Sequence, residues 1–123
     1  LTFVQVSDEN KQRFIDYLDK VESHWFYSVT KITLYEKLDV FIDKGECPQF
    51  TTVGGGCNYE IDYPGKNQIS ELEIYINFTQ FSDKQIKELI CHELMHTWIE
   101  DDVPMDIEEN IAIDIGERYP CFK

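Results

Sequence analysis

The sequence lacks any apolar run long enough to cross a membrane, and its 123 residues include only 11 basic side chains against 24 acidic ones. A membrane-spanning helix needs about 20 apolar residues in succession, so no membrane span is expected. The net charge of −13 repels phosphate backbones and anionic lipid surfaces, which argues against nucleic acid or membrane as a partner. Neutral or cationic partners are favoured, although most of this charge is expected simply to solvate the surface.

Two common motifs are also missing. The four cysteines, Cys47, Cys57, Cys91 and Cys121, form no C-x-x-C pair, so the usual zinc-ribbon and redox spacings are absent. The glycine run at 54–56 lacks the Lys-Ser/Thr ending of a phosphate-binding loop and indicates a turn. The even cysteine count favours disulfides Cys47–Cys57 and Cys91–Cys121, hence a secreted or extracellular protein; reduced thiols would indicate a cytoplasmic one.

What is present indicates a folded protein. Apolar residues make up 42% of the chain, and 8 Phe, 7 Tyr and 2 Trp supply the material for a core. Neither an internal repeat nor a linker divides the sequence. We therefore expect one domain covering residues 1–123 and, in solution, a monomer.

Residue periodicity predicts the order of the elements. Short strands are expected at 1–6, 32–35, within 57–63 and at 71–78. Apolar and polar residues alternate strictly in the last of these, which predicts one core face and one solvent face. Helices are expected at 8–26 with Ser7 as N-cap, from Ser82 with Gln85 completing a capping box, and at 105–119. The predicted fold class is α+β: a small mixed sheet that packs the N-terminal helix and the second helix on one side, with a C-terminal helix after them.

The stretch C-H-E-L-M-H-T-W at 91–98 lies on the second helix. Positions four apart lie one turn above each other, so His92 and His96 present their imidazoles at a separation that one zinc ion can bridge. By helical phase both flank the apolar stripe, and Glu93 falls between the stripe and the histidines. This H-E-x-x-H spacing predicts a zinc site with Glu93 as general base. Two surface histidines on a polar flank are the alternative.

Zinc needs a third protein ligand, and no histidine follows His96. The ligand must then be a carboxylate or Cys121. The apolar face expected for the C-terminal helix consists of Ile107, Ile111, Ala112, Ile115 and Tyr119. By helical phase Glu108 lies at the centre of that face and Glu109 at its edge, so phase alone slightly prefers Glu108.

The segment H-E-L-M-H-T-W resembles the active-site helix of the gluzincins, a clan of zinc peptidases in which several members carry H-E-L-x-H-x-W. The third ligand of that clan is a glutamate on a following helix, with an apolar residue two places later and Ala or Ser three places later. The segment E-N-I-A fits this register with Glu109 as ligand, and the resemblance thus implies His92, His96 and Glu109. It covers residues 70–116 and implies a minimal, single-domain form. Ile113 stands where relatives carry an aspartate that orients a ligand histidine.

The expected function is therefore hydrolysis of peptide bonds by a zinc-activated water, with Glu93 moving the proton. Tyr119 is the downstream phenol expected to stabilise the oxyanion. The substrate is expected to be a peptide or protein, which could pair with the edge of strand 71–78, and nearby acidic groups would favour basic residues in it. The alternative is a zinc-binding regulatory or interaction protein with little or no activity. Loss of cleavage but not of metal on Glu93→Gln would separate the two.

Overall fold

A four-stranded mixed sheet lies at the centre of the computed structural model. The structure describes residues 1–45, 54–61, 69–97, 104–118 and 121–122, with backbone only for 56–61, 69–70, 105 and 115–117. The strands are β1 (Thr2–Val4), β2 (Val29–Tyr35), β3 (Gly54–Ile61) and β4 (Ile69–Ile76). Their order is β1-β2-β4-β3, with β1, β2 and β4 parallel and β3 antiparallel to β4. Among the described strands, β1 and β3 are therefore the edges.

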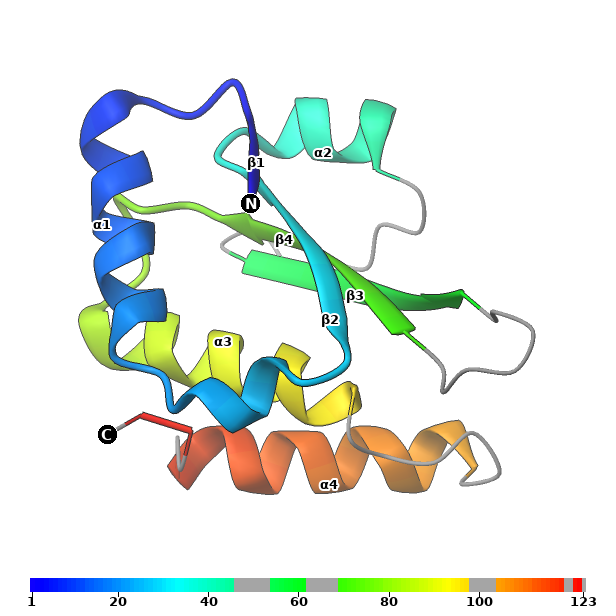
Figure 1. The fold of residues 1–123 in the computed structure, drawn as a ribbon. Helices are drawn as coiled ribbons and strands as arrows, with labels where there is room; N and C mark the ends of the chain where they lie inside the picture. Colours follow the sequence, from blue (N-terminus) through cyan, green and yellow to red (C-terminus); the bar gives the residue numbers. More distant parts are fainter. Residues whose placement is uncertain (46–53, 62–68, 98–103, 119–120, 123) are drawn as a thin grey trace.

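Helices cover both faces of this sheet (Figure 1). The helices are α1 (Asp8–Asp19), α2 (Leu38–Lys44), α3 (Asp83–His96) and α4 (Met105–Arg118), with a short 3-10 helix, η1 (Ser23–Phe26). α1 and α3 pack on one face, α2 lies over the other, and α4 runs alongside α3 on the side away from the sheet. The predicted α+β class, with two helices on a small mixed sheet and a further C-terminal helix, is confirmed.

The main core lies between the sheet and the pair α1 and α3. Its largest fully buried members are Phe14, Leu34, Leu72, Ile74, Ile76, Ile86, Ile90 and Leu94. The α3 stripe thus reaches the sheet as its periodicity predicts. Where β3 begins, a Cβ on Gly54 would lie 2.4 Å from the ring of Phe81, so the missing side chain lets this edge strand approach the start of α3.

Two helix starts follow the predicted caps. The Ser7 side chain accepts a hydrogen bond from the backbone of Asn10, and Ser82 and Gln85 form both bonds of a capping box. The first helix is shorter than the predicted 8–26, however. Val21 forms a β-bridge with Phe122, and the backbone N–H of Glu22 donates to the carbonyl of Cys121 at 2.9 Å. These long-range bonds replace the helical ones, so α1 ends at Asp19.

The solvent face predicted for strand 71–78 is wrong. Glu73 is 3% exposed and Tyr75 2% exposed, because Phe41 of α2 packs against Tyr75 and closes a second, smaller core. The buried Glu73 carboxylate accepts a hydrogen bond from the Tyr35 hydroxyl at 2.9 Å. The sequence contains no clear signal for the helix α2. The helix spans only seven residues, and the side chain of its N-cap residue, Lys37, forms no capping hydrogen bond.

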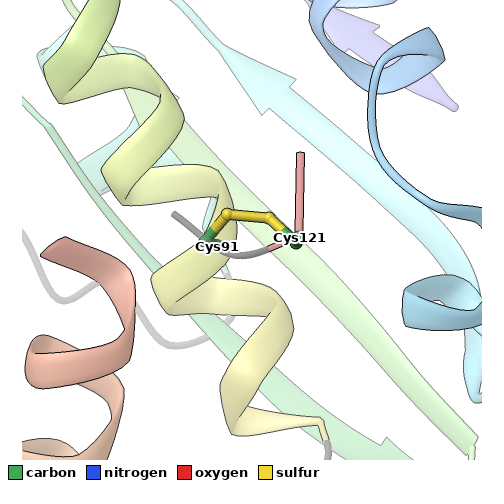
Figure 2. The surroundings of a disulfide bond; sticks show 2 residues. All are labelled: Cys91 and Cys121. Carbon is green, nitrogen blue, oxygen red and sulfur yellow. A yellow bond between two sulfur atoms is a disulfide. The ribbon is translucent and has the colours of Figure 1, made fainter. Parts of the chain in front are cut away.

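The C-terminal segment is joined covalently to α3. Figure 2 shows the disulfide between Cys91 in the middle of α3 and Cys121 after α4, the second of the two predicted pairs. Both cysteines are buried in the main core.

The other predicted pair lies outside the described residues, since neither Cys47 nor the side chain of Cys57 is among them. None of the helices in the described ranges is both long and apolar enough to cross a membrane.

Candidate metal centre

The last turn of α3 brings its two histidines together. His92 and His96 lie four residues apart, and their Nε2 atoms are 3.2 Å from each other. The two rings stand at 75°, so the nitrogens converge while the planes do not stack. Side-chain exposure is 19% for His92 and 10% for His96, so both rings are largely buried.

Glu109 approaches this pair from α4. Its Oε1 lies 3.1 Å from Nε2 of His92, and its Oε2 lies 3.2 Å from Nε2 of His96. Zinc bonds of about 2.0–2.1 Å at tetrahedral angles place donor atoms roughly 3.3 Å apart. The three separations are close to that value, and two imidazoles with one carboxylate form a donor set that zinc accepts. The residues present thus fit a zinc ion.

Glu108 takes a different position from its neighbour. Its Oε2 lies 3.6 Å from Nδ1 of His96, the ring nitrogen opposite the one that faces Glu109. Helical phase correctly places Glu108 on the buried side of α4, where its side chain is 14% exposed against 44% for Glu109. The carboxylate that faces both histidines is nevertheless that of Glu109, in the register that the gluzincin resemblance implies.

The pKa of His92 is lowered. Burial is the main cause, and the charge of nearby His96 adds to it. Glu109 and a hydrogen bond with the Ala112 backbone act in the opposite direction without outweighing burial. The imidazole is therefore neutral at neutral pH, which is the state in which a histidine binds a metal.

Glu93 is a buried carboxyl beside the three donor residues. It is 4% exposed, and burial, followed by the negative charge of Glu109, raises its pKa to about 8. It is not among the residues that converge on the possible metal position. A cation close by favours the ionised form of a carboxyl, so occupation of the site would lower this pKa.

The apolar face predicted for the C-terminal helix is buried only in part, and the side chains of two of its members, Ile115 and Tyr119, lie outside the described residues. Ala112 is buried, but Ile107 is 48% exposed and Ile111 38% exposed. α4 instead turns the side that bears Glu108, Glu109 and Ala112 toward α3. A carboxylate next to a histidine gains electrostatic stabilisation that an isoleucine at this place would not supply.

Two further predictions concern Tyr119 and the strand at 71–78. Tyr119 falls outside the described residues, so its predicted role stays a prediction. Strand 71–78 cannot receive a peptide, since β4 pairs with β2 on one side and β3 on the other. The backbone contact of Ala112 with His92 has no sequence signal, because every residue carries the same backbone groups.

No family model, no curated protein sequence and no solved structure matches this chain.

Proposed function

We propose that this protein is a zinc-dependent peptidase of a minimal, single-domain gluzincin type. The observation that carries the proposal is the convergence of His92, His96 and Glu109, whose ligand atoms, one from each residue, all lie within 4.8 Å of one another. The H-E-x-x-H spacing, with a buried glutamate between the histidines, supports the same chemistry.

Zinc bound at this site would polarise the substrate carbonyl and lower the pKa of a water molecule. Glu93 is the group on the chain that takes the proton and later delivers it to the leaving amine. Its burial supports this role, because burial raises the pKa of the carboxyl and so makes its ionised form a stronger base toward the proton of the water. His92 and His96 would bind the ion through their Nε2 atoms, and the Glu108 carboxylate lies near Nδ1 of His96, on the other side of that ring.

The substrate we propose is an extended peptide or an unfolded segment of a protein. β3 is an edge strand, and α3 packs against it, so its outer edge offers backbone groups close to the active helix. Addition of a strand to such an edge binds a peptide mainly through its backbone.

The Cys91–Cys121 disulfide supports secretion as part of the proposal, since disulfides persist in oxidising compartments.

The test combines metal content with cleavage of an unfolded protein. The native chain should contain about one zinc per molecule by inductively coupled plasma mass spectrometry. Glu93→Gln should keep that zinc and lose cleavage by at least about a hundredfold, as expected of a general base. Zinc in both proteins with cleavage in neither would favour the alternative of a zinc-binding regulatory protein. A native chain without zinc would overturn the site.

A further inference from the structure

α4 carries an unusual share of exposed apolar residues. Within the described residues, the exposed large apolar side chains are Leu1, Tyr27, Ile42, Ile107, Ile111 and Ile113. Three of these six lie on α4, whereas Ile42 lies on α2 and Leu1 and Tyr27 lie outside the helices and strands. Single exposed apolar residues are ordinary on a protein surface, but a group on one element marks an interaction site.

The group has a defined geometry. Ile107 and Ile111 lie one helical turn apart, and Asn110 and Asp114 lie on the same side, three and seven positions after Ile107. Ile113 lies at the border of this side, one turn after Glu109. We call the surface made by Ile107, Asn110, Ile111, Ile113 and Asp114 the outer face of α4; all five are exposed.

The opposite side of α4 fixes this orientation. Contacts of Glu109 with His92 and of Glu108 with His96 hold the helix against α3, and Ala112 is fully buried between them. The isoleucines cannot rotate inward without breaking those contacts. Burial of the outer face therefore requires a separate molecule or segment.

The charge of the protein indicates which kind of partner fits. α4 contains five acidic residues and one basic residue, Arg118, whose guanidinium binds Asp114 at 3.0 and 3.2 Å. The whole chain carries −13, so two copies repel each other while a cationic segment is attracted. We propose that the outer face of α4 binds a cationic, amphipathic segment of a protein partner, with apolar side chains against the isoleucines and basic ones toward Asp106 and Asp114, the described carboxylates of α4 that do not face the histidines.

The probe for this surface is a synthetic helical peptide of lysine and leucine of about 18 residues, long enough to form an amphipathic helix. Binding is measured by fluorescence anisotropy to the Glu93→Gln protein, so that the peptide is not cleaved. Ile107→Ser/Ile111→Ser should weaken binding at least about tenfold, whereas Ile42→Ser, which changes an isoleucine 47% exposed on α2, should leave it unchanged. The control residue lies on the opposite side of the sheet from α4 (Figure 1).

Two further measurements complete the test. A matched peptide with glutamate in place of lysine should bind far more weakly, and added salt should weaken binding of the lysine peptide, since the attraction is partly electrostatic. Circular dichroism of each variant checks that it is folded. Equal binding of both peptides, equal binding to the serine double variant, or a dimer of the free protein that the double variant dissociates would overturn the proposal. This binding requires no peptidase activity, so its failure leaves the proposed function untouched.

Discussion

Oε2 of Glu108 lies 3.6 Å from Nδ1 of His96, on the far side of the ring from the nitrogen that faces Glu109. Adjacent glutamates thus contact opposite edges of one imidazole. A carboxylate that accepts a hydrogen bond from Nδ1 fixes the orientation and tautomer of a ligand histidine without touching the metal itself. At 3.6 Å the Glu108 carboxylate makes an electrostatic contact with this nitrogen, slightly longer than a hydrogen bond.

The first prediction separates these two glutamates. Glu109→Ala should reduce zinc affinity far more than Glu108→Ala, because it leaves only two protein donors. Loss of an orienting carboxylate typically costs about 10- to 100-fold in affinity, roughly 1.4–2.7 kcal/mol. Competition with a chromophoric chelator measures both affinities. If Glu108→Ala lost the metal and Glu109→Ala kept it, the assignment of the third ligand would be wrong by one residue.

A second prediction concerns metal and stability. Zinc at about a hundred times its dissociation constant adds about 2.7 kcal/mol to the free energy of unfolding. For a domain of this size a chelator should then lower Tm by roughly 10 °C. His92→Ala should show no such shift, while His24→Ala, which changes an exposed histidine of η1, should behave like the wild type. Equal melting with and without chelator in the wild type would rule out a bound ion.

The disulfide supplies a third prediction. Cys91 precedes a candidate ligand on α3, and Cys121 follows the helix that bears Glu109, so that the two cysteines lie 30 positions apart in the sequence. Replacement of both by alanine should lower the free energy of unfolding by about 3–4 kcal/mol, mainly because the unfolded chain gains freedom. Zinc affinity should also fall, since α4 is then less restrained relative to α3. Denaturant titration and chelator competition measure these effects, and an unchanged zinc affinity would show that the bridge does not support the site.

A fourth prediction concerns acid stability. The Tyr17 hydroxyl donates a hydrogen bond to Asp83, which is the main cause of the lowered pKa of that carboxyl. A depressed pKa in the folded state gives stability that is present above the unfolded value, near 3.8, and is lost as pH falls through the folded value below it. Tyr17→Phe should therefore cost about 0.5–1 kcal/mol near pH 7, at the low end because Asp83 is exposed.

The cost of Tyr17→Phe should shrink as pH falls below 3.8 and through the lower pKa of Asp83 in the folded state, because the carboxyl is then protonated in both states. Urea unfolding across a pH series measures it. Tyr27→Phe is the matched control, because the Tyr27 side chain is 82% exposed. A deficit in Tyr17→Phe that stays constant into acid would mean that the hydrogen bond does not depend on the charge of Asp83.

Local chemistry was sufficient to predict several features from the sequence. Ser82 and Gln85 specify the start of α3 because both bonds of a capping box join residues three apart. The spacing of His92 and His96 places both on one side of that helix, because residues four apart lie one helical turn from each other. The alternation in β4 correctly identified the strand and the face that enters the main core.

Tertiary structure decided what depends on a neighbour distant in the chain. α1 ends at Asp19 because Val21 pairs with Phe122, and β4 has no solvent face because Phe41 covers Tyr75. α4 turns Glu108 and Glu109 toward α3 because the partner at that place is a pair of histidines and not an apolar surface, and this leaves Ile107 and Ile111 exposed. Amphipathic periodicity shows which residues share a side of a helix, but the free energy of the contact that forms selects the side that is buried.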